Sequence, residues 1–92
     1  MLKYFMALSK DQKSKIIEEF KIHEKDVGSP EVQIALLTEE IKRLTSHLRE
    51  HPHDNTSKRG LILKVAQRRK ILKYLKRISV YRYKKVVEKL DL

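Results

Sequence analysis

The segment 29–48, SPEVQIALLTEEIKRLTSHL, carries the signals that decide the fold. Ser29 is suited to cap a helix, and Pro30 fits the first helical position, where its missing N–H leaves no bond unmade. Glu31 then meets the positive end of that helix. Five apolar residues follow at alternating spacings of three and four: Ile34, Leu37, Ile41, Leu44 and Leu48. This spacing predicts a long helix with one packing face, which ends before Pro52 because the residue before a proline disfavours helical geometry.

Helical patterning extends through most of the chain, which has only two glycines and two prolines among its 92 residues. Ser9 followed by Gln12 has the form of a capping box. Further caps are available at Asp54 or Ser57 and at Ser79. Together with the apolar spacings, these caps predict four helices, at about residues 9–23, 29–50, 54–77 and 79–90.

The predicted fold is all-α and contains no strand. Its second and third helices form a long antiparallel pair, its fourth helix is short, and short loops connect them. The first helix carries only a short apolar stripe, so both a docked and a mobile first helix stay open. One helical domain is expected over residues 1–92, in which residues 1–8 are a disordered tail or an extension around a start-like Met6.

Composition restricts the function classes. The chain contains no cysteine, which excludes a disulfide framework and a thiolate metal site and fits a reducing compartment. No apolar run approaches the ~20 residues of a membrane span, and the first residues are too polar for a secretory signal. We therefore expect an intracellular, soluble protein that is monomeric when free.

The net charge of +10 is confined to one half of the chain. Residues 1–50 hold nine basic and nine acidic side chains, whereas residues 51–92 hold thirteen basic and three acidic ones. Between Lys58 and Lys85 there are twelve basic residues and no acidic one. Solvated surfaces usually mix both signs, because like charges at helical spacing repel one another. The segment therefore predicts a large anionic partner, with nucleic acid the first candidate and an anionic membrane the second.

A basic stripe is predicted on the third helix, on the side away from its leucines. At about 100° per residue, its members are Lys58, Arg59, Arg69, Lys70, Lys73, Lys76 and Arg77. Tyr74 lies at the edge of this stripe, four residues after Lys70 and three before Arg77. Cations bind phosphates and an aromatic ring can stack on an unpaired base, so the stripe favours RNA. The alternative is a solvated face with a half-buried tyrosine.

The loop 51–60, HPHDNTSKRG, first suggests a metal site, because His47 and His51 are four residues apart and His53 follows. The proline inside the loop breaks the helix, and neither a cysteine nor a suitably placed glutamate completes the site, so no metal or other cofactor is expected. Catalysis is disfavoured too, since no oxyanion donor or orienting buried carboxylate is evident.

Two interpretations of the loop stay open. It is a helix cap with solvated neighbours, or it is an edge of short hydrogen-bonding side chains that reads an RNA minor groove. In the second case Asp54 accepts from a donor such as the guanine amino group, because phosphate repels a carboxylate that has no such partner.

Membrane and DNA are the alternative partners. The apolar side of the third helix contains no Trp or Phe, and the second helix offers a matching seam to cover it, which disfavours a membrane surface. Duplex DNA stays open from charge alone, although neither helix-turn-helix spacing nor a dimerisation seam is evident. A basic helical protein that compacts DNA is therefore the alternative function.

Three segments together resemble one family: 27–48 (VGSPEVQIALLTEEIKRLTSHL), 53–77 (HDNTSKRGLILKVAQRRKILKYLKR) and 82–90 (RYKKVVEKL). They are similar to the bacterial-type ribosomal protein fifteen of the small subunit, and the similarity runs without a gap from Met6 onward. Its motifs are G-S-x-E-V-Q at the start of a helix, H-x-x-x-H followed by D-x-x-S, and Q-R-R-[RK]-x-L-x-Y-L.

The resemblance implies a non-enzymatic, structural protein that binds the central domain of small-subunit ribosomal RNA early in assembly, in the cytoplasm or in an organelle. Members of the family hold a three-way RNA junction so that later proteins, including the six–eighteen pair, can bind. The residues matching the surface for a G–U/G–C minor-groove element are His47, Asp54 and Ser57, with His51 close by. The residues matching the junction surface are Gly28, Gln33, Tyr74 and Arg77. Phosphate contacts are expected from Lys58, Arg59, Arg69, Lys70 and Lys73.

The chain departs from the family pattern at four positions. Val27 stands where the family's loop usually has threonine, and Pro52 stands at a position that is often basic. Asn55 and Thr56 stand where relatives often have two more histidines. The resemblance therefore carries no RNA contact over to these side chains, and it leaves open the contacts that family members make to large-subunit RNA across the subunit interface.

Overall fold

The structure, a computed structural model, describes residues 8–26 and 28–92. Within those ranges it contains four helices and no strand: α2 (Lys10–Phe20), α3 (Pro30–Glu50), α4 (Asn55–Ile78) and α5 (Val80–Leu90). The all-α prediction is confirmed, with α3 and α4 the two long helices. Leu8, the last residue of the predicted tail, is buried, whereas the rest of the tail prediction and Val27 lie outside the described residues. No helix in the described ranges has an apolar stretch long enough to cross a bilayer.

Each helix begins at a side chain that accepts a hydrogen bond from its first turn. At α2 the Ser9 hydroxyl accepts from the backbone N–H of Gln12 at 3.1 Å, and the Gln12 side chain accepts from the Ser9 N–H at 2.9 Å. Asp54, rather than Ser57, caps α4. The remaining caps are the predicted ones: Ser29 at α3 and Ser79 at α5.

The helix α2 ends at Phe20, earlier than the predicted end at residue 23. The cause is Asp26, whose carboxylate is buried in the loop that follows. It accepts bonds from three backbone N–H groups: Ile22 at 2.9 Å, Gly28 at 3.1 Å and Ser29 at 2.8 Å. These bonds offer the backbone an alternative to a further helical turn, so the chain folds back toward the start of α3.

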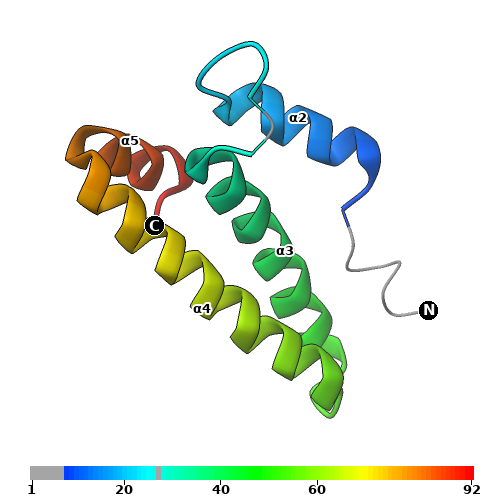
Figure 1. Ribbon diagram of the computed structural model, residues 1–92. Coiled ribbons are helices and arrows are strands. Elements are labelled where there is room, and N and C mark those ends of the chain that lie inside the picture. Colours follow the sequence, from blue (N-terminus) through cyan, green and yellow to red (C-terminus); the bar gives the residue numbers. More distant parts are fainter. Residues whose placement is uncertain (1–7, 27) are drawn as a thin grey trace.

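The long helices α3 and α4 run antiparallel and pack against each other, while α2 and α5 lie near the end of the pair at which α3 begins (Figure 1). The core cluster takes one residue from each of three helices: Ile34, Leu75 and Val86. Phe20 of α2 packs against this cluster from the side. The apolar spacing of α3 therefore predicted the seam around which the other helices assemble.

A bidentate ion pair joins the first turn of α3 to α5. Arg82 donates from Nε to Oε2 of Glu31 at 2.6 Å and from Nη2 to Oε1 at 2.7 Å. Glu31 is only 7% exposed, so its charge is buried and compensated by the fork of the guanidinium. The pair fixes the orientation of α5 against the start of α3.

Candidate nucleic-acid interface

The turn between α3 and α4 brings three predicted site residues into one hydrogen-bonded group, here named the turn cluster: His47, Asp54 and Ser57. Nε2 of His47 lies 2.7 Å from Oδ2 of Asp54, and the Ser57 hydroxyl donates to the same oxygen at 2.6 Å. The other oxygen, Oδ1, accepts from the Ser57 backbone N–H at 3.1 Å. The cluster is largely enclosed, since the side chains of His47 and Asp54 are 10% and 11% exposed.

These bonds set the charge of Asp54 and the donor in its bond to His47. Hydrogen bonds from Ser57 and then His47 lower the pKa of Asp54 to about 2, so the group is a carboxylate at neutral pH. A carboxylate only accepts, so Nε2 of His47 carries a hydrogen and donates to Asp54. A carboxylate offers about four lone-pair positions, and the protein itself engages three of them at Asp54. Asp54 therefore keeps at most one position for a donor from outside.

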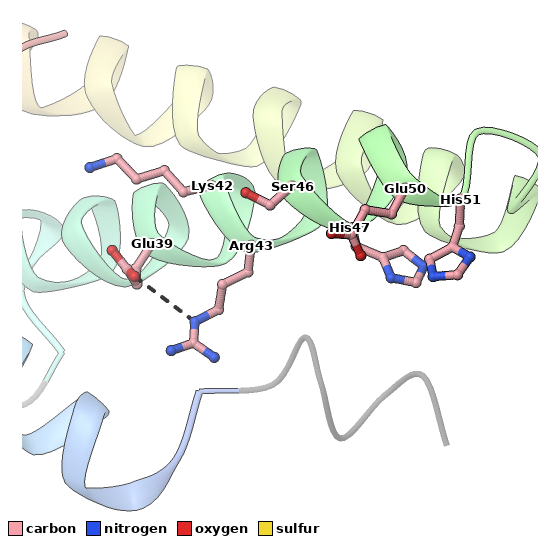
Figure 2. A pocket seen from close by; sticks show the side chains of 7 residues that line it. All are labelled: Glu39, Lys42, Arg43, Ser46, His47, Glu50 and His51. Carbon is pink, nitrogen blue, oxygen red and sulfur yellow. Dashed lines mark ion pairs between the residues drawn. The ribbon is translucent and has the colours of Figure 1, made fainter.

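His51 and His53 are the exposed histidines of the turn. The rings of His47 and His51 lie side by side at the end of α3, with centroids 4.8 Å apart (Figure 2). A shallow hollow of about 520 Å³ runs along this face of α3 and includes both rings. A second hollow, of about 370 Å³, is lined by Glu50, His51, Pro52, His53 and Asp54. His47 and Asp54 of the turn cluster thus each border one of the two hollows.

The histidines of the turn do not gather around a common point. Across residues 8–26 and 28–92, no group of three or more His, Cys, Asp or Glu side chains is arranged to hold a metal ion. One of the two ring nitrogens of His47 is bonded to Asp54 instead. The chemistry that the turn offers is hydrogen bonding.

The predicted basic stripe lies along α4. All seven of its members are exposed: Lys58, Arg59, Arg69, Lys70, Lys73, Lys76 and Arg77. None of the seven forms a salt bridge within the described part of the chain. The two other cations of α4 bind α3 instead, because Lys64 donates to Glu40 at 2.7 Å and Arg68 to the Thr38 hydroxyl at 3.3 Å. The helix thus separates its cations into an inner pair held by α3 and an outer stripe open to a partner.

At the opposite end of the helix pair, Gly28 and Gln33 are joined directly. Nε2 of Gln33 donates to the Gly28 carbonyl oxygen at 2.7 Å, and both residues are exposed. Gly28 does not use its freedom to take a positive φ, and a Cβ at this position would meet no atom within 4 Å. Neither the backbone nor the packing of this protein requires glycine here. The missing side chain leaves room for a partner to approach the backbone closely.

Tyr74 and Arg77 lie at the same end, on α4. Tyr74 is 46% exposed, and the guanidinium carbon of Arg77 lies 5.8 Å from its ring centroid. After hydrogen bonding by Glu31, electrostatic interactions that include Tyr74 raise the pKa of Arg82, which puts Tyr74 within electrostatic range of that residue. The four predicted junction residues therefore lie on the loop before α3, on α3 and on α4, at the end of the helix pair where α3 begins. We name them the far cluster: Gly28, Gln33, Tyr74 and Arg77.

Sequence reasoning missed the acidic residues that build the far cluster. Burial alone would raise the pKa of Asp26, but hydrogen bonds from Ser29, Ile22 and Gly28 outweigh it and lower the pKa to about 2. The only signal for Asp26 was a carboxylate two residues before Gly28. Glu31 was expected only to meet the helix end, because its partner Arg82 is 51 residues away in the sequence.

The turn cluster and the far cluster lie at opposite ends of a molecule whose principal extents are 40, 26 and 18 Å. Between Ser57 and Tyr74, α4 rises about 25 Å at 1.5 Å per residue. The cations of the basic stripe lie toward the two ends of this distance, and the exposed side chains of Ile62 and Leu63 lie between them. Because α3 and α4 pack against each other, helix packing sets the separation of the two clusters.

Comparisons with known proteins identify the family of this chain. The family profile described as ribosomal protein S15 matches residues 13–92. The chain is 56% identical over 85 residues to small ribosomal subunit protein uS15 of Caldanaerobacter subterraneus, which covers 92% of this chain and 97% of the relative. It is also 56% identical over 87 residues to uS15 of Carboxydothermus hydrogenoformans, covering 95% and 98% of the two chains. The chain therefore belongs to the ribosomal protein S15 family and is a structural, non-enzymatic protein of the small subunit of cytoplasmic ribosomes.

Proposed function

We propose that this protein binds a three-way junction in the central domain of small-subunit ribosomal RNA and holds it in the arrangement that later assembly steps require. One observation carries the proposal: two groups of candidate RNA-binding residues lie at opposite ends of one packed helix pair, with an exposed basic stripe between them. A rigid pair of helices can hold two RNA elements at a fixed separation. Binding then favours one junction geometry over the others without any chemical step.

The turn cluster is the proposed contact for a minor-groove element with a G–U and a G–C pair. The wide, shallow RNA minor groove exposes the guanine amino group, which is a hydrogen-bond donor. Two acceptors suit it: Nδ1 of His47, when the ring is neutral, and the remaining lone pair of Asp54. Ser57 orients the carboxylate by donating to it twice, and the exposed His51 adds a polar edge.

The far cluster is the proposed contact for the junction itself. Gly28 allows the RNA to approach the backbone, and Gln33 keeps its carbonyl oxygen for the RNA because its amide nitrogen binds Gly28. Tyr74 supplies a ring on which an unpaired base stacks, and Arg77 supplies a charge for phosphate. Between the clusters, five exposed cations meet the RNA backbone: Lys58, Arg59, Arg69, Lys70 and Lys73.

In this proposal, proteins that bind later are helped indirectly, because this protein has already fixed the geometry of the RNA. The six–eighteen pair of small-subunit proteins binds a junction that is already arranged, so it does not have to select that geometry again. The turn 51–56, which is exposed apart from Asp54, is the proposed site of any contact with large-subunit RNA at the subunit interface. The free protein is expected to be a monomer.

A mobility-shift titration at fixed salt tests the proposal. It compares the junction RNA with its adjacent G–U/G–C helix, the same RNA with the G–U pair made Watson–Crick, and duplex DNA of equal length. We expect tightest binding to the first and a loss of roughly 5- to 150-fold on the second, the range for one good base contact. Equal binding to all three would contradict the proposal and favour the alternative, a basic protein that compacts DNA.

Variants assign the roles in the same assay. Asp54→Ala and Tyr74→Ala should reduce discrimination between the two RNAs, whereas Lys73→Ala should weaken both alike. Because Asp54 also caps α4, Asp54→Asn serves as a control that keeps a capping side chain but removes the charge. If Tyr74→Ala lowers binding of both RNAs equally, its proposed role at the junction is wrong.

A further inference from the structure

A second aromatic and basic surface lies on α5, outside the turn cluster, the far cluster and the stripe. Tyr81 is 67% exposed, more than any other aromatic side chain in the described ranges. The ammonium of Lys85 lies 5.2 Å from its ring centroid. Lys84 is three residues after Tyr81 and is also exposed, so both lysines neighbour the ring on the helix surface.

Folding does not explain this surface. The apolar residues of α5 that face the core are Tyr83, Val86, Val87 and Leu90. At about 100° per residue, Tyr81 lies on the opposite side of the helix. Tyr83 shows the contrast, because its ring packs against the core and is approached by Lys76 at 5.4 Å. The ring of Tyr81, by contrast, is not part of the core, and within the described residues its one ring contact is with Lys85.

The charges around Tyr81 favour an anionic partner. Glu88 is the acidic residue nearest in sequence, one helical turn beyond the lysines, and it forms no salt bridge with either of them in residues 8–26 and 28–92. Ile78 and Val80, which precede Tyr81 in the sequence, are also exposed. A flat ring with two cations beside it offers a stacking surface for a base and counter-charges for its phosphate.

We propose that Tyr81, Lys84 and Lys85 form an additional site that stacks an unpaired nucleotide of the bound RNA, an inference that rests on the proposed RNA-binding function. Its position continues the far cluster. Ser79 alone separates α4 from α5, and Arg82, the residue after Tyr81, lies within electrostatic range of Tyr74. Tyr74 and Tyr81 thus lie seven residues apart, on consecutive helices joined at Ser79.

The chain contains no tryptophan, so Tyr81→Trp places its one tryptophan at the site, where emission can be excited selectively, and keeps a ring that can stack. Titration with the junction RNA should quench its emission strongly at saturation. Leu92→Trp is the matched control, because Leu92 is exposed at the end of the same region but lies outside the site. The emission of the Leu92→Trp protein should change little.

Affinity provides a second readout. Tyr81→Ala should lower the affinity for the junction RNA by roughly 5- to 150-fold, whereas Tyr81→Phe stays near the parental value. Lys85→Ala should make the log–log salt dependence of affinity shallower by about 1. Lys15→Ala, which removes an exposed charge from α2, should leave this slope unchanged. Tyr81 is exposed, so thermal unfolding of each variant should match the parent.

The outcomes separate this site from the proposed function. If the Tyr81→Trp protein binds the junction RNA at parental affinity without quenching, the α5 site is overturned and the proposed function stands. If the parental protein does not distinguish the junction RNA from duplex DNA, the proposed function fails. If, in addition, no RNA quenches the emission of the Tyr81→Trp protein, the α5 site is overturned as well. Quenching by vesicles of anionic lipid and not by RNA would also overturn it.

Discussion

Single acidic residues organise this basic protein at the points where its proposed contacts begin. Asp26 gathers three backbone N–H groups, Glu31 binds Arg82 through two bonds, and Asp54 accepts from His47 and Ser57. Each carboxylate is thus compensated by several hydrogen bonds, as burial of a charge requires. Their common effect is to hold exposed neighbours in place, so residues that do not touch a partner still shape the surface it meets.

Asp26→Asn should destabilise the protein and flatten its response to acid. The pKa of Asp26 in the folded chain is about 2, below its ordinary value of 3.8. A depressed folded-state pKa stabilises the fold above about pH 4, and this contribution is lost as the pH falls through about 2. At pH 7 the variant should therefore lose about 1–3 kcal/mol of unfolding free energy, the value of bonds to a buried charged group.

Urea titrations followed by circular dichroism at pH 7, 4, 3 and 2 would measure the effect of Asp26→Asn. The difference between variant and parent should shrink toward pH 2. Asp91→Asn is a suitable control, because Asp91 is exposed and its φ of 56° suits asparagine. A difference that stays constant at every pH would show that the charge of Asp26 does not hold the loop.

Gly28→Ala should separate binding from folding. No described atom lies within 4 Å of the added methyl group, and φ is not positive, so the folded state gains no strain. The unfolded chain loses conformational freedom, so stability should stay level or rise by about 0.4–1 kcal/mol. Affinity for the junction RNA should fall by roughly tenfold, about 1.4 kcal/mol, because the methyl group keeps the RNA from the backbone. Unchanged affinity in a mobility-shift titration would remove Gly28 from the interface.

At the scale of single helices, α4 combines two tasks through the angular placement of its residues. Leu75 faces the core, Lys64 and Arg68 bind α3, and the outer stripe remains exposed. A helix surface has room for all three faces because its residues repeat about every 3.6 positions. The same helix therefore contributes to the stability of the core and presents the charges that a nucleic acid would meet.

Gly60→Ala should stabilise α4. Gly60 lies within the first two turns of this helix, and a Cβ there would meet no atom within 4 Å. Glycine inside a helix costs about 0.5–1 kcal/mol relative to alanine, so the free energy of unfolding should rise by about this amount. Thermal and urea unfolding would measure it. The Gly60→Ala variant also serves as the control for Gly28→Ala. A lower free energy of unfolding in Gly60→Ala would contradict the prediction and mean that the first turns of α4 are packed differently.

The helices were predictable from sequence because their signals are local. Ser29, Ser79 and the apolar spacing of α3 act on neighbours within one or two turns, and the structure has helices at those positions. The predicted end of α2 was wrong because the Asp26 carboxylate accepts hydrogen bonds from backbone N–H groups of a loop, which has no periodic pattern in the sequence. The bond between His47 and Asp54 depends on the geometry of the turn, so the sequence indicated only that the two residues are close.

At the scale of the whole molecule, charge and shape are arranged along one axis. The far cluster and α5 lie at one end, the turn cluster lies at the other, and the longest extent is 40 Å. The exposed stripe lies between them, while residues 1–50, whose charges sum to zero, supply the partners of Lys64, Arg68 and Arg82. A polyanion that follows this axis would meet stripe cations toward both ends of α4 and a polar cluster at each end of the molecule.

The salt dependence of RNA affinity should report this arrangement. If the five stripe cations between the clusters, Lys58, Arg59, Arg69, Lys70 and Lys73, neutralise about five phosphates, they should contribute about −4 to the slope of log affinity against log salt. Lys73→Ala should make that slope shallower by about 1 and weaken all RNAs alike, because Lys73 is exposed and forms no described ion pair. Lys64→Ala is the matched control on the same helix: its ammonium lies 2.7 Å from Glu40, so the slope should hold and only stability should fall, by about 1 kcal/mol or less. RNA titrations at four salt concentrations would compare the two variants. Equal changes of slope would contradict the division of the α4 cations into a pair held by α3 and a stripe that meets the RNA.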